Sequence, residues 1–398
     1  MLDKLAVEIN RIAREERDYV ADLLQRIIRI PSPSTQEEAV IKLLKQEMES
    51  FKPAQVMVDS IGNVVGKFGS GKRVLLYDSH VDTVGVGDPA GWKVDPFLGA
   101  RRDEVIYGRG ASDNKAGIAC MVAGLKILTR LAREGDFTLY VVGIVQEEDC
   151  EGLALSVLME GSQIKPECVV LGECTNLAIN RGHRGRAEIE VTTRGRSCHA
   201  SAPERGENAI YKMTPIIDGI KHLADRLSSD PFLGKGSIAV TSVECATPSL
   251  NAVPDLCKIY VDRRVVPSDT RETIAREIDE IARFTGAEVK LSRYARASYK
   301  GFTQEREKFF PAWTVAQDSR AVTKAVATYE ALFAGRPAIS KWVFSTDGNY
   351  SMGMRSIPTI GFGPAEERHA HSADDQVRVD DLWKSAAFYA LFPFVYSA

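Results

Sequence analysis

The sequence predicts a mixed α/β fold, in which a larger domain with a mostly parallel central sheet is interrupted by a smaller inserted α+β domain. The chain has 398 residues, enough for two or three domains with buried cores. In its first half, short apolar runs alternate with segments of helical periodicity. From about Arg186 the order changes to strands and helices of an α+β pattern, and after Phe302 the first pattern returns.

The first part, residues 1–185, contains predicted helices and buried strands in alternation. Apolar residues recur at helical spacing from Leu5 to Ile27, and Pro31 ends this segment. Ser34 and Glu37 have the spacing of a capping box, which predicts a second helix over residues 38–48. The later apolar runs predict three strands and one long helix, at 73–77, 138–145 and 168–171 and at 115–133. Strands that alternate with helices favour a parallel sheet.

The middle part, residues 186–298, predicts the order β-α-β-β-α-β, which is that of a ferredoxin-like unit. Its strands are expected at 188–193, 237–244, 258–265 and 288–294, and its helices at 208–227 and 270–284. Residues 299–398 return to the first pattern, with a helix at 320–333 and strands at 342–344 and 358–362. We therefore expect the larger domain to consist of residues 1–185 and 299–398.

Composition excludes several classes of protein. A formal net charge of -3, with 26% charged residues, gives no basic surface for nucleic acid or for a membrane. No apolar run approaches the length of a membrane-spanning helix, and the N-terminal segment lacks the apolar region of a signal peptide. The seven cysteines are odd in number and form no CxxC pair, so we expect reduced thiols and a cytoplasmic location.

Candidate metal ligands stand where predicted strands end. His80 closes an apolar run, and Asp82, two positions later, lies on the same side of an extended chain. A carboxylate beside a metal-bound imidazole fixes its tautomer and raises its basicity. A polar strand end without a ligand is the alternative. Asp113 stands in a glycine-flanked loop before a predicted helix, where it could instead serve only as the helix cap.

Adjacent carboxylates follow the predicted strand at 138–145. Glu147 and Glu148 would repel one another if desolvated, and a metal ion removes that cost. One of them could then bind the metal while the other takes a proton from water. The alternative is a solvated acidic loop. Glu173 follows the next predicted strand, and His371 lies in a polar loop near the C-terminus.

Five of these residues form the candidate metal site: His80, Asp113, Glu148, Glu173 and His371. Nearly all fall at strand ends of one α/β layer, which is where sites in open sheets lie. Imidazole and carboxylate ligands suit zinc, with cobalt or manganese as substitutes.

The ordered motifs HxD, GRGxxDxKxG, EE, GExT and HSADD resemble those of the M20 metallopeptidase family. That family includes acetylornithine deacetylase and succinyl-diaminopimelate desuccinylase. Within it, the sequence most resembles a hydrolase branch linked to selenium metabolism. The resemblance covers essentially the whole chain. It implies a zinc-peptidase-like catalytic domain with an inserted dimerisation and lid domain, and a homodimer formed through residues 186–298.

The resemblance also implies roles for individual residues. Asp113 would bridge two zinc ions, one completed by His80 and Glu173 and the other by Glu148 and His371. Asp82 would orient His80, and Glu147 would be the general base.

In the inserted domain, the resemblance implies that His199 reaches the site of a partner protomer and stabilises the oxyanion. Asn251 and Arg264 match positions that bind a substrate carboxylate, a task for which an arginine fork is suited. Ser345 and Thr346 belong to a segment that resembles a substrate-contacting loop.

The function implied is that of a dinuclear zinc hydrolase. Its substrate would be a small molecule with a carboxylate, and the bond cleaved would be the amide of an N-acyl amino acid or of a peptide-like compound. Glutamate at position 173 resembles the deacylase and carboxypeptidase members, whereas aminopeptidases have aspartate there. A dipeptidase or aminopeptidase of the same family and a non-catalytic binding protein on the same scaffold are the alternatives.

Overall fold

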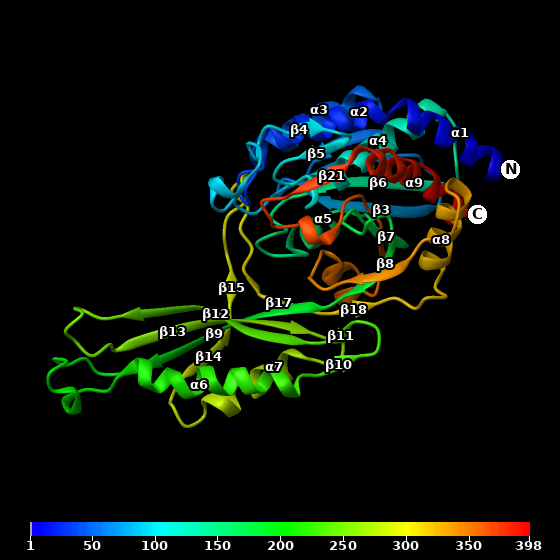
Figure 1. Cartoon of the computed structure of the whole chain (residues 1–398). Helices are drawn as coiled ribbons and strands as arrows, with labels where there is room; N and C mark the ends of the chain where they lie inside the picture. The colour runs from blue at the N-terminus through cyan, green and yellow to red at the C-terminus, as the bar shows by residue number, and fades with distance from the viewer. Residues whose placement is uncertain (1) are drawn as a thin grey trace.

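The computed structural model describes residues 2–398 and contains two domains, each with its own sheet and its own hydrophobic core. Figure 1 shows the larger domain above, with both termini, and the smaller domain extending below it. The predicted α/β fold with an inserted α+β domain is confirmed. No helix within residues 2–398 combines the length and the apolar character needed to cross a membrane.

The large domain is built on a nine-stranded sheet whose central strands are parallel. The order across the sheet is β1 (Gln55–Val58), β2 (Val64–Phe68), β6 (Phe137–Ile144), β3 (Arg73–His80), β7 (Cys168–Leu171), β20 (Thr359–Gly361), β8 (Ile179–His183) and β18 (Trp313–Thr314), with β19 (Ile339–Trp342) also paired to β8. His80 pairs with Ile144, and Asp78 pairs with Leu171. The carboxyl ends of β3, β6 and β7 therefore meet at one edge of the sheet.

Helices cover this sheet, and most of the predicted ones are present. They are α1 (Leu2–Glu15), α2 (Arg17–Ile28), α3 (Glu38–Ser50), α4 (Lys115–Leu131), α5 (Leu153–Gly161), α8 (Arg320–Leu332) and α9 (Val379–Ser397). The first helical segment is divided in two at Glu16, whose carboxylate pairs with Lys126 at 2.7 Å and with Arg130. The sequence did not predict α9, because this helix is buried along nearly its whole length and has no polar face.

The predicted capping box at Ser34 and Glu37 is wrong, although the helix does begin at Glu38. The Ser34 hydroxyl donates to the Asp82 carboxylate at 2.6 Å. One oxygen of Glu37 accepts the backbone N–H groups of Thr35 and Gln146, at 2.8 and 3.1 Å. Both side chains therefore support the loops at the edge of the sheet instead of capping α3.

The smaller domain is the predicted ferredoxin-like unit. Its elements are β9 (Gly185–Arg194), α6 (Ala209–Leu223), β12 (Ser237–Ala246), β13 (Leu256–Val265), α7 (Arg271–Ala282) and β14 (Glu288–Leu291). The antiparallel sheet has the order β12-β13-β9-β14, and α6 and α7 lie on one face of it (Figure 1). The short strand β17 (Phe309–Phe310) also pairs with β9, so this sheet receives residues beyond the predicted boundary at residue 298.

Candidate metal centre

His80, the last residue of β3, points its ring toward a cluster of carboxylates. Its Nε2 lies 2.9 Å from Oδ1 of Asp113, 3.6 Å from Oε1 of Glu173 and 3.9 Å from Oε2 of Glu147. Its Nδ1 lies 3.0 Å from the backbone oxygen of Asp82 and 3.5 Å from the Asp82 carboxylate. Asp82 therefore fixes the ring chiefly through its main chain.

Asp113 lies between two imidazoles. Its Oδ1 faces His80, and its Oδ2 lies 3.1 Å from Nε2 of His371. The same nitrogen of His371 is 3.0 Å from Oε2 of Glu148. Ligand atoms of His80, Asp113 and Glu148 all lie within 4.8 Å of one another, which is close enough for a shared cation. One carboxylate oxygen of Asp113 thus faces His80, and the other faces His371.

The Asp82 carboxylate holds the acidic turn that follows β6. Oδ1 accepts the backbone N–H of Glu147 at 3.1 Å, and Oδ2 accepts that of Glu148 at 3.2 Å. Gln146, just before this turn, has a left-handed backbone with a φ of 58°. Such conformations are uncommon for residues other than glycine and collect at functional sites. Asp82 thereby positions both glutamates as well as His80.

The negative charge of these buried carboxylates is unfavourable unless a cation lies among them. Burial raises the pKa of Glu173 to about 8 and raises that of Glu147 well above its usual range. Oε2 of Glu173 is buried and has no hydrogen-bond partner among the residues described. Burying a carboxylate oxygen without a hydrogen-bond partner destabilises the folded state, and a bound metal ion would remove this penalty.

The two histidines compensate this negative charge when no metal is bound. Hydrogen bonds to Asp113 and Glu148 raise the pKa of His371 to about 10. Burial lowers the pKa of His80, but Glu147 and Glu173 outweigh that effect and raise it well above its usual range. Divalent cations would take over the same role and would bind the neutral imidazoles. Two histidines and three carboxylates form a donor set that fits zinc.

A cavity of about 400 Å³ opens onto these groups. Beyond the ligands and Glu147, its walls include Arg186, Arg264, Phe344, Ser345 and Glu367. Of the predicted substrate contacts, Arg264 and Ser345 therefore line the cavity. Thr346 does not, because it is fully buried and its backbone N–H donates to Nδ1 of His183 at 2.9 Å.

The structure does not bring His199 and Asn251 to the cavity of their own chain. Both are exposed in the smaller domain, where an isolated bridge pairs His199 with Ala252. Nδ1 of His199 lies 2.7 Å from the Ser201 hydroxyl. Among residues 2–398, no contact holds this imidazole at the cavity.

Sequence reasoning missed Asp375, whose carboxylate connects the two loops that carry Asp113 and His371. It is 1% exposed and accepts the backbone N–H groups of Gly110 and Ser112, both at 2.7 Å, as well as the Ser112 hydroxyl. Arg109 adds a buried ion pair at 3.1 Å. The only signal in the sequence was its place in the HSADD motif.

We expect the substitution Asp375→Ala to lower the free energy of unfolding by about 2–3 kcal/mol and to weaken zinc binding about tenfold or more. The reason is that buried N–H groups lose their acceptor and the Asp113 loop loses its support. Denaturant titration and zinc titration measure both effects. Asp374→Asn is the matched control, because Asp374 is partly exposed and pairs with the surface residue Lys93. Equal effects of both substitutions would contradict this role.

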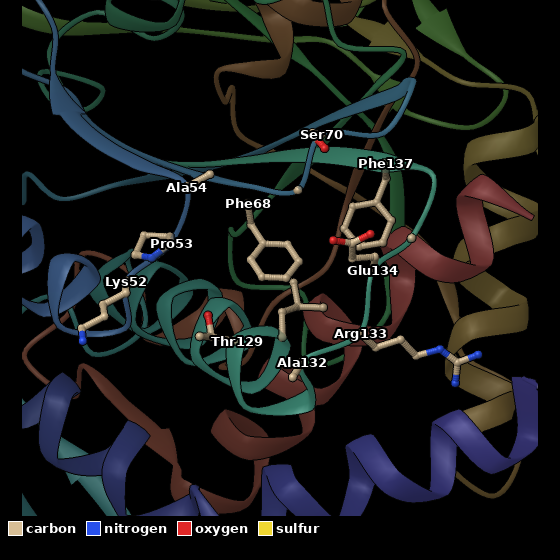
Figure 2. Close-up of a pocket in the computed structure, with 13 residues that line it drawn as sticks. Lys52, Pro53, Ala54, Phe68, Ser70, Thr129, Ala132, Arg133, Glu134 and Phe137 are labelled. Carbon is tan, nitrogen blue, oxygen red and sulfur yellow. The ribbon is translucent and has the colours of Figure 1, made fainter.

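A second cavity, of about 350 Å³, lies at the opposite end of β6 (Figure 2). Phe137, the first residue of β6, lines it together with Phe68, Lys52, Arg133 and Glu134. Its lining contains no histidine or cysteine and only one acidic residue. It offers no acid–base or metal-binding cluster, in contrast to the cavity at the carboxyl ends of the strands.

Comparison with known proteins places the chain in a family. The model of peptidase family M20/M25/M40 matches residues 76–393. The chain is 42% identical over 387 residues to the uncharacterized protein YgeY of Escherichia coli K12, covering 96% of each chain. It is 27% identical over 384 residues to a succinyl-diaminopimelate desuccinylase of Cereibacter sphaeroides, covering 91% of this chain and 95% of the other.

Among solved structures, the fold resembles that of the YXEP protein of Bacillus subtilis, described as a dinuclear metal binding peptidase from the M20 family. The TM-score is 0.65 at 14% sequence identity, and the match covers 96% of this chain and 98% of the other. At that identity the likeness concerns the fold alone.

Proposed function

We propose that this chain, which belongs to peptidase family M20/M25/M40 and is therefore a hydrolase of C–N bonds, uses two zinc ions to cleave an amide bond. The substrate is an N-acyl amino acid or a small peptide-like compound with a carboxylate. The observation that carries the proposal is the place of Asp113 between two imidazoles, each with a buried glutamate beside it.

The residues divide naturally into two sets of ligands. We assign His80 and Glu173 to one ion, Glu148 and His371 to the other, and Asp113 to both. The dinuclear metal binding of a protein with this fold supports that assignment. When bound, such ions lower the pKa of water and polarise a carbonyl oxygen.

Glu147 is the general base in this proposal. Its carboxylate is nearly buried, lines the cavity and faces the ligands without belonging to their closest cluster. Burial raises its pKa, which suits a group that takes a proton from water and returns it to the leaving amine. Asp82 holds the backbone N–H of Glu147 and so keeps the base in position.

Arg264 binds the substrate carboxylate in this proposal. It lines the cavity, and Asp262 fixes its guanidinium through contacts of 2.8 and 3.0 Å. Ser345 provides a further polar group on the cavity wall.

We further propose that the working unit is a homodimer formed through the smaller domain. The exposed position of His199 supports this, because the imidazole would need a partner protomer to reach a substrate. Asn251 lies beside it and would contribute to the same shared site: the backbone N–H of Ala200 donates to the Asn251 carbonyl at 2.7 Å. The seven cysteines are free thiols, which supports a reducing, cytoplasmic location.

The test is a substrate screen on protein that has been stripped of metal and reloaded with zinc, cobalt or manganese. N-acyl amino acids and free-amine dipeptides are compared at equal concentration. We expect metal-dependent release of the free amine, with zinc or a substitute restoring turnover to the stripped protein. Absence of hydrolysis with every metal would overturn the proposal and favour a binding protein on the same scaffold.

A further inference from the structure

We propose that Glu367 makes this site selective for substrates that carry a positively charged amine in addition to a carboxylate. The inference rests on the proposed function and names its substrate class. The preferred substrate would be zwitterionic, with the carboxylate bound at Arg264 and the ammonium group at Glu367.

Glu367 shares the cavity with the reacting groups. It opens a short 3-10 turn, Glu367–His369, that leads directly into the ligand His371. The cavity that Glu367 lines is the one lined by Arg264 and Phe344. A substrate bound in this cavity therefore lies close to the negative charge of the Glu367 carboxylate.

Apart from the proposed ligands and the proposed base, the acidic residues that line the cavity are Glu151 and Glu367. Glu151 pairs with Arg186 at 2.7 Å. No lysine, arginine or histidine among residues 2–398 forms an ion pair with Glu367. The ligands and the general base aside, it is the acidic wall group left available to a substrate.

The surroundings of Glu367 favour a cation. Burial raises the pKa of the Glu367 carboxyl, with a smaller contribution from Asp113, whereas the backbone of Val343 and the charge of Arg184 oppose this rise. Arg184 donates to the backbone oxygen of Lys235 at 2.9 Å, which holds it away from an ion pair. A substrate ammonium group would supply the missing partner. A neutral group in the same place would desolvate the carboxylate without compensation.

The experiment uses pairs of substrates that differ in a single amine. Glycyl-leucine is compared with acetyl-leucine, and Nα-acetyl-lysine with Nα-acetyl-norleucine, on zinc-loaded enzyme. We expect at least one amine-bearing member to be favoured about tenfold or more in kcat/KM, the ratio expected for one charge-assisted contact. Glu367→Gln should reduce that preference to about one, mainly through KM.

Glu366→Gln is the matched control, because Glu366 is the neighbouring acid and already pairs with Arg368 at 2.7 Å. It should keep the preference. No preference in either pair, a preference that survives Glu367→Gln, or an equal loss for both members of a pair would each overturn the role of Glu367.

Failure of the proposed function is recognised separately. If the wild-type protein hydrolyses none of the four compounds, calorimetry measures the binding of Nα-acetyl-lysine and Nα-acetyl-norleucine to wild type and to Glu367→Gln. Tighter binding of Nα-acetyl-lysine to wild type, abolished by the substitution, supports the role of Glu367. Equal binding of the two acetylated compounds overturns it.

Discussion

Replacing Glu147 with alanine lowers kcat by about two orders of magnitude or more and leaves the zinc content unchanged. The side chain is 6% exposed, and its Oε2 lies 3.9 Å from Nε2 of His80, farther than any of the direct contacts among the ligands. Its removal therefore takes away a base without taking away a ligand. Steady-state kinetics and elemental analysis of the purified variant measure the two effects.

Asp149→Asn is the control for this substitution. Asp149 belongs to the same acidic turn, but its carboxylate contacts Arg296 and, at 3.3 Å, the hydroxyl of Tyr294. We expect this variant to keep both its zinc and its turnover. Near-wild-type turnover in Glu147→Ala would show that another group moves the proton.

Replacing Asp113 with alanine abolishes binding of both ions and reduces turnover to background. One of its oxygens lies 2.9 Å from His80 and the other lies 3.1 Å from His371, so each half of the cluster depends on this carboxylate. Two metal sites that share a ligand also lose the group that separates their charges. Zinc stoichiometry by elemental analysis and a turnover assay on the same sample give the result.

His371→Ala provides the graded comparison. His371 is the most exposed of the ligands, at 54% for the side chain, and lies on one side of Asp113 only. We expect this variant to keep about one zinc ion per chain, held by the set around His80. If Asp113→Ala and His371→Ala bind the same amount of zinc, then Asp113 does not bridge the two sites.

The sequence was most informative about the ligands at strand ends. His80, Glu148 and Glu173 each follow an apolar run, and parallel strands bring such positions to one edge of a sheet. The order of motifs then placed His371, which pattern alone left in an ordinary polar loop. The structure brings these side chains together, as local pattern and the direction of the strands predict, and their role as metal ligands stays a proposal.

Other features depend on contacts between distant segments, which no local pattern encodes. Asp375 binds backbone groups more than 260 positions earlier in the chain. Glu367 is distinguished only by the folded structure, in which no basic side chain of residues 2–398 forms an ion pair with it. Ser345 and Thr346 are neighbours in sequence, yet only Ser345 lines the cavity, because the buried Thr346 is hydrogen-bonded to His183.

We propose above all that one carboxylate, that of Asp113, binds two metal ions between His80 and His371. The most direct measurement is the anomalous difference density of a crystal of the zinc-loaded protein, collected at the zinc absorption edge. We expect two peaks, one on each side of Asp113, with His80 and Glu173 at one and Glu148 and His371 at the other. A single peak, or peaks that do not contact Asp113, would contradict it.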